Sequence, residues 1–278
     1  MTANRSIVTA VASAICVTAV LIWPAVANDN SIFVQSTTST KNSGLYAHLL
    51  PQFKAATGIT VNVVAVGTGQ AIRNARNCDG DVLLVHAKGA EEKFIADGFG
   101  IKRYDLMYND FVIVGPPEDP ARITGGLDAT AAFKKIAATK ALFASRGDDS
   151  GTHKKERTLW LDAGIDPTAD SGKWYRETGS GMGTTLNVGV GMGAYVMTDR
   201  ATWIAFRNKA DFKILVEGDK ALFNQYGVIT INPKKCPNVR IAQAEMFSRW
   251  LRSPAGQAAI ATYKRDGRQL FFPNAHAD

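Results

Sequence analysis

Nine consecutive residues, from Ser145 to His153, carry the side-chain types that hold a small anion. Arg146 lies four residues before the Ser-Gly-Thr at 150 to 152, which begins a predicted helix. The guanidinium is always charged and presents its donors in a rigid fork, and the hydroxyls and free backbone N–H groups of a helix start are further donors. No nucleophile in this segment has an evident base beside it. The segment therefore indicates capture of an anion and not reaction with it.

Three other turns share this composition. Residues 37–40, 67–70 and 181–185 are rich in Thr, Ser and Gly, and the pattern places such turns at the carboxyl ends of predicted strands. Ligands of open α/β sheets bind at those ends. Glycine lets the backbone approach a ligand closely, and each helix start adds partial positive charge. If the turns converge across a cleft, they form an anion site from neutral donors and one arginine.

Catalysis and metal binding are the alternatives to anion capture. Ser150 and His153 are three residues apart on a predicted helix, so a secreted serine hydrolase is one hypothesis, although no G-x-S-x-G motif surrounds Ser150. The four histidines form no metal-binding spacing, which predicts no metal site and no cofactor. His86, at the end of a predicted strand, is interpreted as a structural side chain. Asp148 or Asp149 is expected to orient Arg146.

The chain as a whole alternates predicted strands with helices. Apolar strands at 32–35, 59–66, 81–85 and 111–115 alternate with helices at 45–56, 71–76 and 90–96. After Pro116 the rhythm resumes, with strands at 142–144, 194–197 and 212–216 and a helix at about 150–163. Such alternation predicts an α/β fold with a largely parallel sheet.

Two lobes are expected. The roughly 250 residues after position 27 exceed the usual size of a single hydrophobic core. The strand at 227–231, followed by Pro233, resembles 111–115 followed by Pro116, and the two predict a hinge that the chain crosses twice. The prediction assigns residues 28–115 and 224–278 to one lobe and residues 116–223 to the other.

The N-terminus has the pattern of a secretory signal peptide. Arg5 precedes an apolar run from Ile7 to Trp23, and Ala25-Val26-Ala27 predicts cleavage after Ala27, so residues 1–27 are expected to be removed. A retained membrane anchor fits this pattern less well. The formal net charge of +7 is spread along the chain in single residues and pairs, which favours attraction of small anions and gives no support to nucleic-acid binding.

Two cysteines, Cys78 and Cys236, remain in the mature chain. Because an exported protein meets oxidising conditions, the even number predicts one disulfide between them. Two separate buried thiols are the alternative.

Several segments together resemble the periplasmic tungstate-binding proteins of ABC importers. The resemblance covers nearly the whole mature chain, and residues 247–257 are similar to a segment found more widely in type II periplasmic binding proteins. The segments that carry the resemblance to the tungstate-binding proteins are 36–45, 64–71, 81–87, 108–116, 145–153 and 194–200.

The resemblance implies a two-lobed type II periplasmic binding protein. Each lobe would hold a mixed, mostly parallel sheet flanked by helices, and the lobes would close on one tetrahedral oxyanion without catalysis. The protein would be a periplasmic monomer that delivers its ligand to an ABC permease. The implied ligand residues are Thr38, Ser39, Thr68, Gly69, Arg146, Ser150, Gly151, Thr152, Thr184 and Thr185. The Arg-x-x-x-Ser-Gly-Thr spacing is also similar to that of phosphate-binding proteins, so molybdate and phosphate stay open as ligands beside tungstate.

Overall fold

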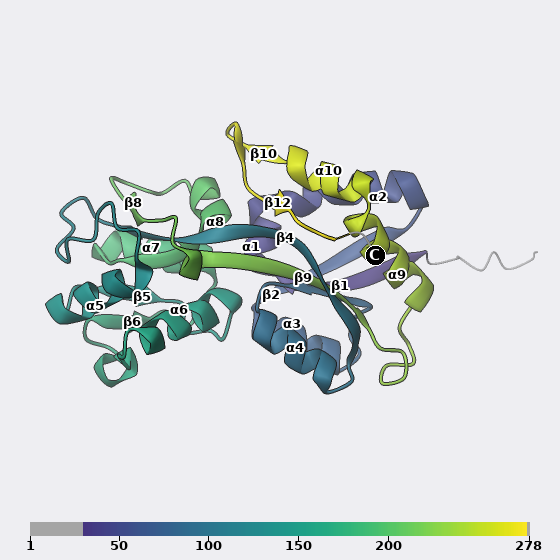
Figure 1. Ribbon diagram of the computed structural model, residues 1–278, viewed down its shortest axis with the longest axis horizontal. Coiled ribbons are helices and arrows are strands. Elements are labelled where there is room, and N and C mark those ends of the chain that lie inside the picture. Colours follow the sequence, from purple (N-terminus) through teal and green to yellow (C-terminus); the bar gives the residue numbers. More distant parts are fainter. Residues whose placement is uncertain (1–29, 277–278) are drawn as a thin grey trace, which may run out of the picture.

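Two α/β lobes lie side by side in the computed structural model, which describes residues 30–276 (Figure 1). The predicted signal peptide, residues 1–27, lies outside the described residues. Two long strands, β4 (Gly100–Gly115) and β9 (Phe223–Ile231), run between the lobes. Within residues 30–276, no helix combines the length and apolar character that crossing a membrane requires.

The sheet of the first lobe is mixed. Its strand order is β12-β4-β9-β3-β1-β2, where β1 is Ser31–Thr37, β2 is Thr60–Val66, β3 is Val82–Val85 and β12 is Phe272–Pro273. Pairing is parallel between β1 and β2 and between β1 and β3, but antiparallel from β3 to β9, β9 to β4 and β4 to β12. Parallel pairing therefore dominates only among the first three strands. The reason is that β4 leaves this lobe and β9 returns to it, so the two run in opposite directions.

Helices cover both faces of this sheet. On one face lie α3 (Thr68–Arg76) and α4 (Lys88–Ala96); on the other lie α2 (Leu45–Thr57), α9 (Ile241–Arg252) and α10 (Pro254–Thr262) (Figure 1). Strand β3 is buried on both sides, with Val82 and Leu84 in one core cluster and Leu83 and Val85 in the other. This explains its continuous apolar sequence, since side chains alternate between the faces of a strand.

The second lobe has its own core. Its elements are α5 (Ala129–Thr139), β5 (Phe143–Ser145), α6 (Gly151–Asp162), β6 (Tyr175–Glu177), α7 (Met182–Met192), β7 (Val196–Asp199), α8 (Arg200–Ala205) and β8 (Lys213–Val216). Aromatic side chains fill the centre, where the ring centroids of Phe133 and Trp160 are 4.2 Å apart and both rings contact Phe143. Packing of this kind holds β5 and α6, which carry the ends of the polar segment 145–153, in fixed positions.

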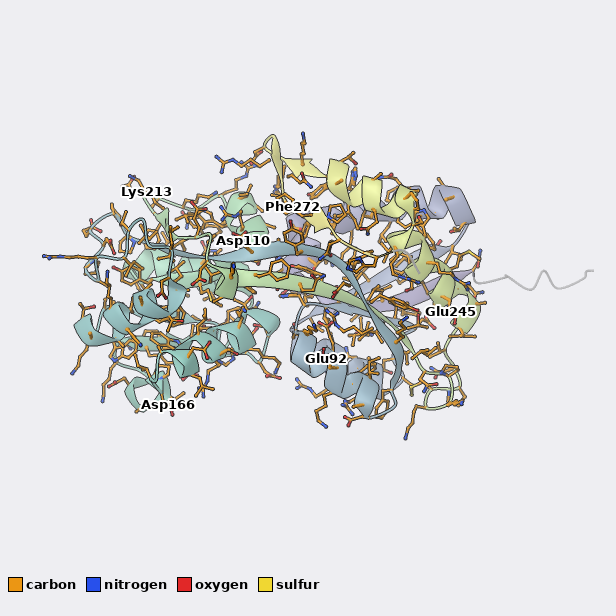
Figure 2. The ribbon with its side chains drawn as sticks, viewed as in Figure 1. Glu92, Asp110, Asp166, Lys213, Glu245 and Phe272 are labelled. Atoms are coloured by element: carbon orange, nitrogen blue, oxygen red, sulfur yellow. A yellow bond between two sulfur atoms is a disulfide. The ribbon has the colours of Figure 1, made fainter. Side chains whose placement is uncertain are left out.

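The chain crosses between lobes at Asp110 and Phe223, which pair with each other. Residues 111–115 were predicted to belong to the first lobe, but they pair with β7 and β8 of the second. Pro116 and Pro233 therefore follow the far ends of the crossing strands and do not mark the hinge. Asp110, labelled in Figure 2, accepts from Arg200 Nε at 2.7 Å, an ion pair beside the crossing.

A disulfide joins Cys78 and Cys236, whose Cα atoms are 5.2 Å apart. Cys78 follows α3 closely, and Cys236 lies in the connection after β9. The bond therefore ties the end of α3, whose start carries Thr68 and Gly69, to a segment 158 positions later.

Candidate functional site

All four polar turns singled out in the sequence are starts of helices. Besides α3, α6 and α7, the turn at 37–40 forms the beginning of a short helix, α1 (Thr38–Ser43). Thr37 and Ser150 cap α1 and α6 by accepting from Thr40 N and His153 N, at 3.4 and 3.2 Å. Helix α3 begins three residues before its predicted start, which places Thr68 and Gly69 in its first turn. These positions have backbone N–H groups that their own helices leave unpaired.

Helices α3 and α6, from different lobes, meet at Thr68 and Gly151. Thr68 Oγ1 accepts from Gly151 N at 2.9 Å, and both residues are buried. A Cβ atom on Gly151 would lie 2.8 Å from His86 Cε1, and one on Gly69 would lie 2.0 Å from Asp149 Oδ2. At Gly151 only glycine permits this approach, because real Cβ contacts are longer and the His86 ring is buried; at Gly69 the exposed side chain of Asp149 could turn aside. The predicted residues from two lobes are thus brought together with the cleft closed.

Arg146 is buried, with 3% of its surface exposed, and is paired with Asp148. Arg146 Nη2 is 2.5 Å from Asp148 Oδ2, and its Nε donates to the Ser180 carbonyl at 3.3 Å. Asp148 Oδ1 also accepts from Ser150 N at 3.2 Å. Asp148 therefore has the orienting role expected of one of the two aspartates.

Asp149 faces the other way. Its side chain is more than half exposed and pairs with Lys154 of its own lobe and, at 3.8 Å, with Arg73 of the first lobe. Exposed pairs of this kind contribute less than about 1 kcal/mol. Asp149 thus lies at the rim of the cleft and has no part in orienting Arg146.

Thr152, in the first turn of α6, is fully buried. Within the described chain its Oγ1 has no hydrogen-bond partner. Leaving a buried hydroxyl unpaired costs about 1–3 kcal/mol, and native structures rarely do so without a ligand or water nearby. Of the predicted residues, Thr152 points most directly to a bound group.

Thr38 and Ser39 lie at the start of α1. Thr38 is half-buried and Ser39 is buried. Ser39 Oγ is 3.2 Å from Thr37 Oγ1 and 3.3 Å from His86 Nε2. His86, interpreted from the sequence as a structural residue, therefore contacts a predicted ligand residue. Burial lowers the pKa of His86 to about 4, with the positive charge of Arg146 acting in the same direction, so the ring is neutral at pH 7.

The structure does not bring Thr184 and Thr185 into the same position as the others. Thr184 is exposed. Thr185 is buried, but its Oγ1 is 2.7 Å from Thr178 Oγ1 and donates to the Ser180 carbonyl at 3.3 Å. Adjacent helical residues point about 100° apart, and on α7 the direction of Thr184 is the one that faces solvent. Thr185 supports the segment that also holds Arg146, a role the sequence pattern did not indicate.

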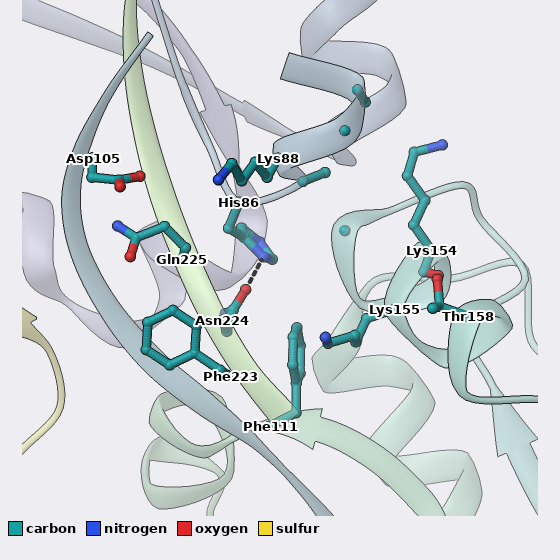
Figure 3. A pocket seen from close by; sticks show the side chains of 14 residues that line it. His86, Lys88, Asp105, Phe111, Lys154, Lys155, Thr158, Phe223, Asn224 and Gln225 are labelled. Atoms are coloured by element: carbon teal, nitrogen blue, oxygen red, sulfur yellow. Dashed lines mark hydrogen bonds between the residues drawn. The ribbon is translucent and has the colours of Figure 1, made fainter. Parts of the chain in front are cut away.

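A basic groove of about 590 Å³ adjoins this site between α4 and α6 (Figure 3). His86 and Gly151 belong to its lining, and Lys88, Lys154 and Lys155 surround it from both lobes. Lys154 and Lys155 are neighbours in the sequence, and the fold brings Lys88 of the other lobe to the same groove. Asp105 also lines the groove, and Lys154 and Lys88 pair with Asp149 and Glu92, so the lysines leave only part of their positive charge near the site.

Ser150 and His153 do not form a nucleophile and base. Ser150 Oγ accepts from the backbone N–H of His153, and His153 Nδ1 accepts from Asp149 N at 3.1 Å. Within residues 30–276, no hydrogen bond joins the hydroxyl to the imidazole, and no group of three His, Cys, Asp or Glu is placed to hold a metal ion. The arrangement can bind an anion but lacks the pairing that activates a serine.

Two lobes joined by two crossing strands, with helix starts meeting between them, are the architecture of a periplasmic solute-binding protein. The PBP superfamily domain matches residues 24–255, and the chain belongs to this superfamily.

More specific relatives lie within it. Tungstate-binding protein TupA of Peptoclostridium acidaminophilum is 47% identical over 249 residues, covering 88% of this chain and 86% of that protein. The chain is thus a member of the TupA family. The solved structure of TupA from Desulfovibrio alaskensis G20 is 49% identical, with a TM-score of 0.76 over 88% of this chain and 99% of that one. The tungstate ABC transporter structure from Geobacter sulfurreducens is 46% identical, with the same TM-score over 84% and 98%.

Proposed function

We propose that this protein is the solute-binding component of an ABC importer and captures tungstate between its lobes. The observation that carries the proposal is the buried hydroxyl of Thr152, which has no hydrogen-bond partner among residues 30–276 and lies in the segment that holds Arg146, where the lobes meet. The names of its relatives support tungstate as the ligand.

The ligand shell combines one charge with many neutral donors. Arg146 has five N–H groups, of which Asp148 and Ser180 accept from two, so others are left for the anion. Helix starts with their hydroxyls supply the remaining donors: Thr38 and Ser39 of α1, Thr68 and Gly69 of α3, and Ser150 and Thr152 at α6. The N–H of Gly151 donates to Thr68 Oγ1 in this arrangement and must leave that acceptor to reach the anion. Backbone N–H groups at helix starts suit a dianion because they carry partial positive charge and cannot move away.

Closure of the two lobes distinguishes the ligand-bound protein from the ligand-free one. An anion held by donors from both lobes stabilises the closed arrangement over the open one, and the permease then recognises the closed form. The chain acts outside the cytoplasm after export, and its signal peptide is removed after Ala27. N-terminal sequencing of the exported protein checks the cleavage point.

Titration calorimetry with tungstate, molybdate, sulfate and phosphate tests the ligand. Tungstate should bind most tightly, with sulfate and phosphate far weaker. A preference for phosphate would replace the assignment by a phosphate receptor, and a preference for molybdate would keep the class of protein and change its ligand.

A further inference from the structure

His86 lies where the predicted anion site meets the hinge. It follows β3, is 6% exposed, and stacks on Tyr226 with ring centroids 4.8 Å apart. Its Cε1 is the atom that a Cβ on Gly151 would meet at 2.8 Å. The imidazole is therefore a surface of the first lobe against which the start of α6 closes.

A chain of polar side chains connects this imidazole to both crossing strands. His86 Nδ1 is 3.0 Å from Asn224 Oδ1 on β9 (Figure 3), and Asn224 Nδ2 donates to Asn109 Oδ1 on β4 at 2.6 Å. At the other end, His86 Nε2 is 3.3 Å from Ser39 Oγ. The four residues form one buried relay from the hinge to the start of α1.

The direction of this relay decides what Ser39 can offer a ligand. In the described arrangement Asn224 Oδ1 faces Nδ1, so the neutral ring carries its proton there and Nε2 accepts from Ser39. A serine hydroxyl has one proton, and this arrangement leaves none of it for an anion.

Rotating the side-chain amides of Asn109 and Asn224 by 180° exchanges their oxygen and nitrogen atoms and reverses the direction in which the relay donates hydrogen bonds. Asn109 Nδ2 then donates to Asn224 Oδ1, and Asn224 Nδ2 donates to His86 Nδ1. His86 Nε2 donates to Ser39 Oγ, so the hydroxyl hydrogen of Ser39 is free to donate to an anion. The hinge end of this relay favours the second arrangement. Asn109 Nδ2 and Tyr226 Oη are buried without a well-formed hydrogen bond in the described part of the chain, although Asn109 lies beside the Tyr226 hydroxyl. Reversal gives Asn109 Nδ2 the acceptor Asn224 Oδ1 and turns Asn109 Oδ1 towards a hydroxyl that can donate to it, and buried donors are rarely left without an acceptor.

We propose that His86 is a positioning residue that aims the Ser39 hydroxyl at the bound anion through this reversible relay. The inference rests on the proposed function and adds to it a residue that does not itself touch the anion. Because the relay ends on β4 and β9, it also connects the ligand to the strands about which the lobes move.

A double-mutant cycle tests the proposal by calorimetry, using whichever of the four anions the wild type binds best. His86→Phe keeps an aromatic ring on Tyr226 and Gly151 but removes both hydrogen bonds, and should weaken binding about tenfold. Ser39→Ala should weaken it to a similar extent. If His86 acts through Ser39, the double variant binds no more weakly than Ser39→Ala alone.

Two further variants separate this role from packing. His86→Gln retains a donor and an acceptor and should recover most of the affinity that His86→Phe loses. His48→Phe, on α2 at a histidine that contacts the Ala259 carbonyl, is the matched control and should bind as the wild type does. If His86→Phe does not fold, Asn224→Ala replaces it in the cycle, because it removes the partner of Nδ1 and leaves the ring in place.

Nitrogen-15 NMR of labelled histidine reads the relay directly. The His86 signal, assigned by its loss in His86→Gln, should change from the Nδ1–H to the Nε2–H tautomer when the anion is added. Additive losses in the cycle, no recovery in His86→Gln, or an Nδ1–H tautomer in the complex would each overturn the proposal. A wild type that prefers phosphate refutes only the tungstate assignment, whereas one that binds none of the four anions refutes the proposed function and this inference with it.

Discussion

At the residue scale, the site depends on a charge and a hydroxyl that the fold buries. Arg146 is held in place by Asp148, whose opposite charge compensates part of the cost of burying the guanidinium. Thr152 has no such compensation within the described chain. Two buried groups with donors to spare, in one short segment, are more readily explained by a ligand than by stability alone.

Replacing Arg146 by Ala should weaken tungstate binding at least a hundredfold. The change removes the only formal positive charge among the predicted ligand residues and leaves Asp148 facing the anion. Arg146→Lys keeps the positive charge but loses the forked arrangement of donors, so its affinity should lie between those of the wild type and Arg146→Ala. Calorimetry measures the series. Equal affinity of Arg146→Ala and the wild type would remove this guanidinium from the ligand shell.

Thr152→Val should separate binding from stability. The substitution removes a hydroxyl that has no described partner, so the ligand-free protein should unfold at the same urea concentration or a higher one. Tungstate affinity should fall about tenfold because one hydrogen bond to the anion is lost. Thr184→Val, at an exposed threonine of α7, is the control and should change neither quantity. A Thr152→Val protein with unchanged affinity would show that the hydroxyl has no role in binding.

At the element scale, the starts of α3 and α6 can approach each other because glycine has no side chain at the contact. Gly151 packs on His86 and Thr68, and Gly69 packs on Asp149. The disulfide fixes the opposite end of α3 to the segment after β9. The first lobe thus presents a rigid helix start to the moving one.

Gly151→Ala should hinder closure without unfolding either lobe. The added methyl group would meet His86 Cε1 at 2.8 Å and Thr68 Oγ1 at 3.0 Å, and both neighbours belong to the other lobe. Affinity should therefore drop at least tenfold while the unfolding midpoint changes little. Gly183→Ala, in the first turn of α7 where a Cβ meets nothing within 4 Å, is the matched control. Wild-type affinity in Gly151→Ala would mean that ligand binding does not need this contact.

The Cys78→Ser, Cys236→Ser variant should lose stability but keep its affinity. Removing a native disulfide costs about 2–5 kcal/mol of unfolding free energy, mainly because the unfolded chain gains conformational freedom when the crosslink is absent. The hydrogen bond from Gly151 N to Thr68 lies at the other end of α3, so binding to the folded variant should be unchanged. Urea unfolding and calorimetry measure the two quantities. A large loss of affinity at full folding would instead assign the bond a role in shaping the site.

At the scale of the whole molecule, each lobe buries a glutamate whose pKa is raised to about 7 by burial. Glu91 of the first lobe pairs with Arg103. Glu156 of the second forms no ion pair within residues 30–276 and accepts from Tyr175, Ser145 and Trp160. Glu156 accepts from the hydroxyl of Ser145, the residue before Arg146, so this carboxyl lies at the base of the polar segment 145–153.

Stability should therefore fall as pH rises through this window. The unfolded carboxyl ionises near 4.5 and the folded one near 7, so the Glu156 contribution is present in full below 4.5 and is lost towards pH 7 and above. Gln resembles the protonated acid and does not titrate. Going from pH 5 to pH 8, Glu156→Gln should gain about 2–3 kcal/mol of unfolding free energy relative to the wild type, measured with urea. A difference independent of pH would show that Glu156 is ionised throughout.

The order of elements could be read from the sequence because it depends on local patterns. Helices such as Leu45–Thr57 and strands such as Thr60–Val66 agree with the predicted ranges within a few residues. The exact crossing point could not be read, because Phe111–Gly115 has the same apolar pattern whichever lobe it pairs with. The threonine pair on α7, Thr184 and Thr185, was likewise ambiguous, since composition does not say which side of a helix start is buried.

The sequence by itself determined a two-lobed α/β receptor and the segment from Arg146 to Thr152, because charge, hydroxyls and helix signals there are neighbours along the chain. Only the tertiary structure decided which partners face that segment. Thr68 and His86 reach it from the other lobe, Asp148 and not Asp149 holds Arg146, and Thr184 is left in solvent. These contacts join residues up to 83 positions apart, and they depend on how two separately packed cores come together about β4 and β9.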